Sequence, residues 1–381
     1  MARKRRGRGE GGVFQRADGQ WCASVSLGYA PDGKRIRRVV YGQTKQEVQD
    51  KLRELQNNVG RGIAADAGTL TLAAWLTRWL EIVRPTVAPA SYAQYERNCR
   101  LHITPLLGAI RLAKLKRGDV VGFYPALARQ GVSPAQRRQV GVALTMALNR
   151  AVDLDLIPSN PAARVRKPKA DKPDIAVLDP EQVARFRAAA AGDRLEALYI
   201  TALDTGARPG ALFALTWADL DFDRGFISVS KSLEDINGVL RVKDVKTKRS
   251  RRRIDLSQAT LAALAERRKA MLAAGHYAPD RPVFCDTEGG YLRLSNLRRS
   301  SFKPILTRAG LPDIRFYDLR HTCATLLLLA DTPAKVVSER LGHSSITMTL
   351  DTYSHVLPTM QKRAADVMGR ILGQVPPAKA E

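Results

Sequence analysis

Two linker-like segments constrain the fold most, because they separate three stretches of different hydrophobic periodicity. The segment "GRGIAADAGT" at 60–69 is rich in glycine and alanine, and "PSNPAARVRKPKADKP" at 158–173 mixes proline with basic residues. Neither shows the apolar repeat of a strand or a helix. A proline-stiffened basic linker suits two domains clamped around a polyanion, although a solvated tether has the same composition. We therefore expect several domains rather than one core.

The expected units differ in secondary structure. They are a flexible basic tail at 1–12, a small β-sheet module with one helix at 13–60, an all-helical domain at 69–160, a basic linker at 161–175 and an α+β, mainly helical domain with one small antiparallel sheet at 176–381. A length of 381 residues is enough for several such cores.

The first unit reads as three strands and a helix. Residues 13–41 show strand patterns divided by the turns "ADGQ" and "PDGK". Thr44 and Glu47 have the spacing of a capping box, and one face of the helix that follows carries Val48, Leu52, Leu55 and Val59. The third strand carries Arg35, Arg37 and Arg38, and a small sheet of this kind can enter the major groove of DNA. A purely structural β-module is the alternative.

The other two units are read from helix signals and short strand patterns. Apolar stripes and caps predict helices near 72–83, 92–103 and 119–130, and a fourth begins at Ser133 and Pro134 and runs to about Leu156. In the last unit Asp179 and Pro180 begin a helix, and a helical stretch is broken at Gly206. Strands are expected at 225–230, 239–245 and 252–256.

Charge and cysteine usage narrow the functional class. Sixty-two lysines and arginines against 37 acidic residues give a net charge of +25, which attracts polyanions and above all nucleic acid. No apolar run approaches the ~20 residues of a membrane-spanning helix, and the N-terminus lacks the apolar core of a secretory signal. The four cysteines form no CxxC pair, which argues against a disulfide framework or a zinc site and favours a reduced, cytoplasmic protein.

Five separated motifs in the last unit carry a specific resemblance. In order they are "TGARPG", "KTKRSRRRIDL", "DLRHT", "LGHSS" and "DTYSHV". This series resembles the catalytic domain of tyrosine recombinases, specifically phage-type integrases. The likeness extends over nearly the whole chain, since 13–57 is similar to the family's arm-binding module and 70–157 to its helical, SAM-like core-binding domain. It implies an enzyme that cuts and rejoins DNA through a 3′-phosphotyrosine, as a site-specific recombinase of a mobile element.

The resemblance assigns the central roles residue by residue. Tyr353 matches the nucleophile, and a phenol with a reference pKa of ~10 needs nearby cations and a proton acceptor to attack. Arg208 and Arg320 match the two arginines that hold the scissile phosphate. Their planar guanidinium groups can meet phosphate oxygens bidentately and stabilise the charge that develops there.

Two further positions complete the catalytic set. Lys246 matches the general acid on a β-hairpin loop that protonates the leaving 5′-oxygen, although only the motif separates it from Lys243 and Lys248. The rest of the basic run, including Lys248, Arg249 and Arg251, is expected to contact DNA phosphates. His343 matches the residue that hydrogen-bonds the scissile phosphate.

The chain departs from the family pattern at two positions. Tyr317 stands where the family has histidine, three residues before Arg320, and Ala211 stands where an acidic residue is frequent. Tyrosine can hydrogen-bond a phosphate but accepts a proton less readily than imidazole. We expect slower chemistry, with Tyr317 still at the phosphate. His321 and His355 lie outside the catalytic positions, and His321 is expected to support the turn at Arg320.

The resemblance also predicts partners and leaves two rivals. Expected partners are double-stranded attachment sites, a homotetramer joined through the helix after Tyr353, an excision directionality factor and a DNA-bending host protein, in a bacterial cytoplasm at the nucleoid. We expect no cofactor and no metal, since the chain has neither a P-loop nor a carboxylate cluster. The rivals are a relaxing type IB-like topoisomerase and a weakened, recombinase-like DNA-binding regulator.

Overall fold

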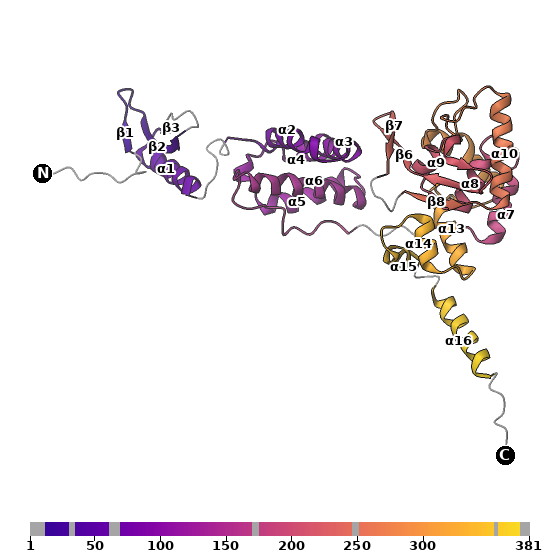
Figure 1. Cartoon of the computed structure of the whole chain (residues 1–381). Helices are drawn as coiled ribbons and strands as arrows, with labels where there is room; N and C mark the ends of the chain where they lie inside the picture. Colours follow the sequence, from indigo (N-terminus) through magenta and orange to yellow (C-terminus); the bar gives the residue numbers. More distant parts are fainter. Residues whose placement is uncertain are drawn as a thin grey trace, which may run out of the picture. The chain divides into compact units, whose positions relative to one another are not determined.

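The computed structural model describes residues 12–29, 35–60, 69–169, 175–245, 251–353 and 357–373 (Figure 1). The chain divides into two compact units, Met1–Lys172 and Pro173–Glu381. Each unit is described by itself. Lys246, Lys248, Arg249 and His355 lie outside the described residues, so the predictions for them stay predictions.

The N-terminal module is the expected sheet and helix. Strands β1 (Gly12–Gln15), β2 (Trp21–Tyr29) and β3 (Arg35–Gly42) form an antiparallel sheet in the order β1-β2-β3, and α1 (Lys45–Gly60) packs against it. Their shared core contains Ala23, Val48 and Leu52. The cap of α1 differs slightly from a capping box: Thr44 accepts from the Glu47 amide, but the Glu47 carboxylate accepts from Gln43.

The helical body follows the predicted pattern closely. Its helices are α2 (Leu72–Val83), α3 (Pro89–Asn98), α4 (Thr104–Leu107), α5 (Arg117–Arg129) and α6 (Pro134–Asp153), with a π-helical turn at Cys99–Ile103. The Ser133 side chain caps α6 by accepting from the Gln136 amide. Trp75 is buried and donates from its indole to the Ala147 carbonyl at 2.9 Å. This core therefore holds its largest aromatic through a main-chain partner.

One part of the expected linker belongs to this body. Residues 161–165 form turns, and Ala162 and Val165 are buried in the core of the helical body. Arg117 also donates to the Arg164 carbonyl at 3.2 Å. The sequence did not reveal these two buried residues because proline and basic residues surround them. The packed region extends at least to Val165.

The second unit is mainly helical, with short strands. Its helices are α7 (Pro180–Ala190), α8 (Glu196–Thr205), α9 (Pro209–Phe213), α10 (Gln258–Ala273), α11 (Leu294–Leu297), α12 (Lys303–Arg308), α13 (Asp318–Leu329), α14 (Ala334–Leu341), α15 (Ile346–Tyr353) and α16 (Leu357–Gly373), with a π-helical turn at Arg298–Phe302. Asp179 caps α7, as predicted, and it also forms a full capping box with Gln182.

The strands of this unit form two sheets rather than the one expected. One sheet has the order β4-β5-β8, from β4 (Leu220–Asp221), β5 (Phe226–Val229) and β8 (Arg252–Asp255). The other pairs β6 (Lys231–Ile236) with β7 (Val239–Asp244). Strand β6 escaped prediction because "KSLEDI" mixes charged and polar residues and buries only Leu233. Strands β7 and β8, on either side of residues 246–250, thus belong to two different sheets and do not pair with each other.

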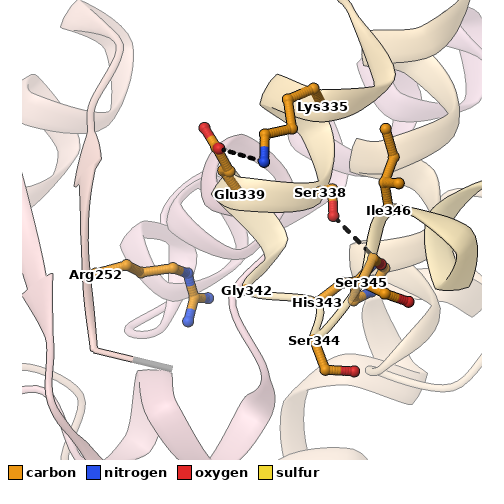
Figure 2. A pocket seen from close by; sticks show the side chains of 9 residues that line it. All are labelled: Arg252, Lys335, Ser338, Glu339, Gly342, His343, Ser344, Ser345 and Ile346. Carbon is orange, nitrogen blue, oxygen red and sulfur yellow. Dashed lines mark hydrogen bonds and ion pairs between the residues drawn. The ribbon is translucent and has the colours of Figure 1, made fainter. Parts of the chain in front are cut away.

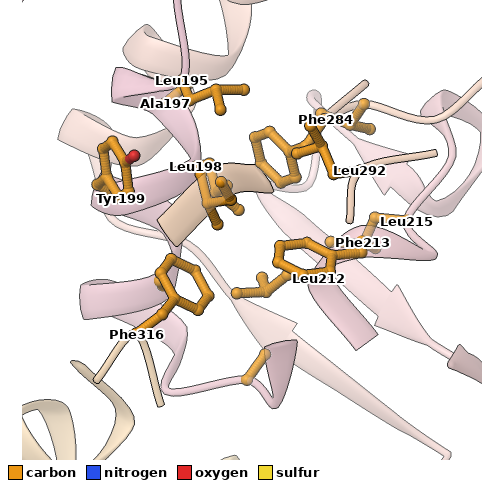
Figure 3. Packing of buried hydrophobic residues seen from close by; sticks show 14 of the residues in the cluster. Leu195, Ala197, Leu198, Tyr199, Leu212, Phe213, Leu215, Phe284, Leu292 and Phe316 are labelled. Carbon is orange, nitrogen blue, oxygen red and sulfur yellow. The ribbon is translucent and has the colours of Figure 1, made fainter. Parts of the chain in front are cut away.

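An aromatic core supports the second unit. Tyr199, Phe302 and Phe316 pack with ring centroids 5.6–6.2 Å apart, and Phe186 joins them edge-on. Figure 3 shows Tyr199 and Phe316 beside Leu198 and Leu212 of α8 and α9. A separate small cluster lies among α13, α14 and α15 and consists of Ala324, Leu328, Val337, Leu341 and Tyr353. The candidate active site is built around this cluster.

Candidate active site

A loop between α14 and α15 is the centre of the site. Gly342 ends α14 with φ of 67°, in the left-handed region that favours glycine. A Cβ at this position would lie 2.7 Å from Nη1 of Arg252, so a side chain would also displace that guanidinium. The amide of His343 donates to the Ser338 carbonyl at 3.0 Å, which fixes the start of the loop. Glycine thus lets a charged side chain approach the main chain.

Arg320 lies on one side of this loop, in the first turn of α13. It is only 2% exposed, and its Nη1 donates to the Leu341 carbonyl at 2.8 Å and to the Gly206 carbonyl at 2.7 Å. Its Nη2 is buried without a hydrogen-bond partner among the described residues. A buried unpaired donor is costly, so this atom is a natural contact for an anion.

Arg208 reaches the same loop from the N-terminus of α9. Both of its terminal nitrogens lie 3.4 Å from the Gly342 carbonyl, and the side chain is half-buried. Burial, and then the charge of Arg208, lower the pKa of Arg320. The structure therefore brings together the two arginines that the sequence singled out, on consecutive carbonyls of one loop.

Arg252 of β8 adds a guanidinium that the sequence analysis missed. Its Nε donates to the Arg340 carbonyl at 2.8 Å, and Figure 2 shows its side chain extending from the strand toward Gly342. Burial, followed by the charges of Arg320 and Arg208, lowers the pKa of Arg252 to about 9. A signal was present, because strand alternation places Arg252 on the same side as Ile254, which is buried.

His343 follows directly on this loop. Its Nδ1 lies 2.7 Å from the hydroxyl of Thr349, which is fully buried in α15 and fixes the ring. Burial and the charges of Arg320, Arg208 and Arg252 lower the pKa of His343 to about 4. The imidazole is therefore neutral at pH 7 and can donate or accept a hydrogen bond without adding charge.

Tyr353 ends α15 and is 1% exposed. Its neighbours in sequence are small and polar, but its ring packs in the apolar cluster that α13 and α14 supply. Burial raises the pKa of its phenol, and the charge of Arg320 opposes that rise. The hydroxyl lies 2.9 Å from Nδ1 of His321. The sequence analysis expected His321 to support the turn at Arg320 and did not foresee this hydrogen bond to Tyr353.

The remaining predicted residues that the structure describes make contacts of their own. Tyr317 is 38% exposed, and its ring lies edge-on to that of His321 with centroids 5.3 Å apart. Ala211 is buried in α9. Arg251 is exposed and pairs with Asp244 at 3.0 Å. Arg35, Arg37 and Arg38 lie in β3, paired with Tyr29, Ser26 and Val25 of β2.

Two small pockets meet at Arg252. One of about 250 Å³ is lined by Arg208, Lys243, Val245 and Arg252, among others. Lys243 forms an ion pair there with Glu234 across the β6–β7 hairpin. The other, of about 230 Å³, extends over Gly342 and His343 (Figure 2). Val245, the last described residue before Lys246, lines the first pocket together with Arg208 and Arg252.

The described residues offer neither a metal-binding cluster nor a membrane-spanning helix. No three His, Cys, Asp or Glu side chains gather there as metal ligands would, and none of the helices is long and apolar enough to cross a membrane. All four cysteines are buried and unpaired, as expected for small core residues.

Comparison with known proteins agrees with the motif series. The profile of the Phage integrase family matches residues 176–360, and that of the phage integrase N-terminal SAM-like domain matches 71–128. A tyrosine recombinase XerC-like protein of Caldanaerobacter subterraneus subsp. tengcongensis is 31% identical over 370 residues, 91% of this chain and 94% of that protein.

Solved structures show the same fold. The Tn1549 transposon integrase in complex with a circular-intermediate DNA has a TM-score of 0.68 at 23% identity, over 78% of this chain and 100% of that one. A lambda integrase tetramer bound to a Holliday junction has a TM-score of 0.58 at 18% identity, over 88% and 96%. The relative matched over nearly its full length and the two family profiles establish that the chain belongs to the phage integrase family of tyrosine recombinases.

Proposed function

We propose that this chain is a site-specific DNA recombinase that cuts and rejoins DNA through a phosphotyrosine at Tyr353, and so integrates or excises a mobile element. One observation carries the proposal. Arg208 and Arg320 donate to consecutive carbonyls of the Leu341–Gly342 loop, from which His343 also projects. Three separated motifs of the sequence thus meet at one point, and the charge of Arg320 acts on Tyr353.

The guanidinium groups supply the site for the scissile phosphate. Attack on a phosphodiester spreads negative charge over its non-bridging oxygens, and fixed arginines stabilise that charge in the transition state. The unpaired Nη2 of Arg320 is one donor for such an oxygen. Arg208 is a second, and Arg252 strengthens the local positive field, since it lowers the pKa of the neighbouring His343. This cluster is built for an anion rather than for a neutral ligand.

The other predicted groups act on protons and on the phosphate. His343, held by Thr349, donates a hydrogen bond to a phosphate oxygen. Lys246 protonates the leaving 5′-oxygen from the segment that follows Val245. The phosphotyrosine retains the energy of the broken bond, so a 5′-hydroxyl of the partner duplex reverses the step without ATP. In this scheme Tyr317, which is exposed at the start of α13, also contacts the phosphate.

The domains divide the DNA between them. In our proposal 13–60 holds separate arm sites through Arg35, Arg37 and Arg38. The helical body, 69–165, and the unit 176–381 clamp the core site and are joined by the basic residues that follow Val165. Lys248, Arg249 and Arg251 contact the phosphate backbone near the cleavage point. Such phosphate contacts set register and affinity but carry no sequence information by themselves.

The assembly is a homotetramer on DNA, joined through α16. Its described side chains include the exposed apolar residues Val367, Met368, Ile371 and Leu372. An apolar helix face of this kind suits docking on a neighbouring protomer. A directionality factor for excision and a host protein that bends DNA complete the reaction, in the bacterial cytoplasm at the nucleoid.

Covalent capture tests the function. Wild-type and Tyr353→Phe proteins are incubated with sheared DNA of the source genome, denatured in detergent, and the protein-bound DNA is sequenced. Fragments that require Tyr353 and share one junction support a site-specific recombinase and reveal the site. DNA binding without any tyrosine-dependent covalent product would instead indicate a regulator, and relaxation of plasmids lacking that junction would indicate a topoisomerase.

A further inference from the structure

Three rings form a row that the catalytic motifs do not explain. Tyr317, His321 and Tyr353 follow one another, with ring centroids 5.3 Å apart in the first pair and 5.8 Å in the second. Tyr317 is 38% exposed, whereas Tyr353 is 1% exposed. The row therefore leads from the surface to the buried hydroxyl of the proposed nucleophile, with an imidazole in the middle.

The contact inside this row is a hydrogen bond to a reacting atom. Nδ1 of His321 lies 2.9 Å from Oη of Tyr353. The two residues come from different helices, α13 and α15, which pack through the cluster of Ala324, Leu328 and Leu341. Since Tyr353 is buried and His321 is half-buried, this contact is held by the packing of the helices and is not a contact between two freely exposed side chains.

We propose that His321 holds the Tyr353 hydroxyl and accepts its proton during attack, which gives this chain an imidazole base although Tyr317 stands where the family has histidine. The proposal rests on the proposed function. In the step, the O–H bond of Tyr353 breaks and its proton moves to Nδ1 of His321. The phenolate oxygen forms the bond to phosphorus, the bond from phosphorus to the 5′-oxygen breaks, and that oxygen takes a proton from the general acid. Rejoining returns the proton from His321 to Tyr353.

The surroundings of His321 suit a proton acceptor. Burial lowers its pKa, so the ring is neutral at pH 7 with Nδ1 able to accept. Asp318, one turn earlier on α13, opposes this and stabilises the imidazolium once it forms, whereas Arg320 and Arg315 disfavour it. The other titratable groups in contact with the ring, or in its field, are Tyr317, Tyr353 and His343.

The other imidazole of the site, that of His343, already has a hydrogen-bond partner. Nδ1 of His343 is hydrogen-bonded to Thr349, and the neighbouring arginines hold its pKa well below that of an ordinary histidine. A group so reluctant to take a proton suits a phosphate contact better than a base. The two histidines thus have separate tasks, set by which residue each one contacts.

The test compares single-turnover cleavage at several pH values on a synthetic duplex carrying the junction recovered by covalent capture. His321→Asn keeps a hydrogen-bonding group near the position of Nδ1 but cannot take the proton. We expect its cleavage rate to fall about 100-fold or more, with unchanged thermal stability and unchanged DNA binding in a gel-shift assay. The acid limb of the wild-type pH–rate profile, which reports protonation of His321, should be absent from the variant. The matched control is His276→Asn, since this histidine follows α10 outside the site, and it should cleave at the wild-type rate.

A second variant separates catalysis from structure. Tyr317→His in the His321→Asn background places an imidazole at the family position, and we expect it to restore the rate at least about tenfold. His321→Asn cleaving like wild type, or slowing without any change in its pH profile, would overturn the proposal while leaving the recombinase intact. A wild-type chain that cleaves no DNA would instead contradict the proposed function, and this inference with it.

Discussion

Two tyrosines of the second unit are equally buried and differ in what surrounds the hydroxyl. Tyr199 and Tyr353 are each 1% exposed, and burial raises the pKa of both phenols. The Tyr199 ring packs against Phe186, Phe302 and Phe316, and its hydroxyl contacts Ser301. The Tyr353 hydroxyl contacts an imidazole instead.

The charges near the two hydroxyls complete the contrast. The strongest charge acting on Tyr199 is that of Asp193, which raises its pKa further although Arg194 and Arg308 oppose it. The strongest charge acting on Tyr353 is that of Arg320, which lowers its pKa. A core tyrosine and a proposed nucleophile therefore differ not in burial but in the imidazole that contacts the hydroxyl and in the sign of the strongest charge acting on it. Variants of the aromatic core are therefore suitable controls for variants of the Tyr353 site, and the reverse is also true.

Removing the two hydroxyls should give opposite results for DNA capture. Tyr353→Phe keeps the ring in its cluster and should reduce covalent DNA capture to background, with a loss of about 1 kcal/mol of stability from the hydrogen bond to His321. Tyr199→Phe should retain capture and lose about 1 kcal/mol of stability, the usual worth of one hydrogen bond. Capture on denaturing gels and melting by circular dichroism measure both. Capture that survives in Tyr353→Phe would erase the distinction between the two sites.

Truncation of the aromatic core should act on stability. Phe302 is fully buried among Phe186, Tyr199 and Phe316, so Phe302→Ala should cost about 3–5 kcal/mol in the free energy of unfolding. Urea denaturation measures this loss. Protein that remains folded at low temperature should still form the Tyr353 adduct, because no catalytic group contacts this ring. A loss below about 1 kcal/mol would show that the core is less tightly packed than the ring contacts indicate.

Arg320→Lys should act on chemistry. Lysine keeps the charge but loses the planar fork that joins two carbonyls and presents Nη2, so the cleavage rate should fall about 100- to 1000-fold. Arg340→Lys is the matched control, because Arg340 forms an ion pair with Asp204 at 2.8 Å, a structural contact. Single-turnover cleavage compares them. An equal loss in both variants would mean that arginine geometry matters only for folding.

Acid should weaken the site more than the aromatic core. The folded chain holds the pKa of His343 at about 4, below the ordinary value of 6.5, so between these values the unfolded chain binds the proton more readily. Stability is therefore expected to fall as pH drops from about 6.5 toward 4, and His343→Gln should remove part of that slope. Urea midpoints across this range measure the effect. An unchanged slope in His343→Gln would indicate that other groups cause the acid sensitivity.

Local signals predicted most of the helices and the caps at Thr44, Ser133 and Asp179, although the Glu47 carboxylate accepts from Gln43 rather than from Thr44. Ser133 and Asp179 cap α6 and α7 because their side chains bond amides only three residues away. The motif series likewise brought Arg208 and Arg320 forward, since their spacing resembles a known family. What these predictions share is that each depends on a few neighbouring residues or on a pattern of known order.

Contacts between distant segments could not be read in the same way. His321 and Tyr353 are 32 residues apart, and Arg208 and Gly342 are 134 apart, so only the folded chain shows that they meet. Strand β6 depends on pairing with β7 rather than on its own apolar pattern. Arg252 is the intermediate case, because alternation with Ile254 could have revealed its inward direction but not its contact with Gly342.

The most direct test of the central claim is to identify the residue that carries the DNA. The captured complex would be digested with nuclease and protease, and the peptide bearing a nucleotide sequenced by mass spectrometry. Our account predicts a phosphotyrosine link at Tyr353, within the peptide that includes the end of α15. A nucleotide attached to Tyr317, to Tyr199 or to any serine would contradict the account, however efficiently the protein cut DNA.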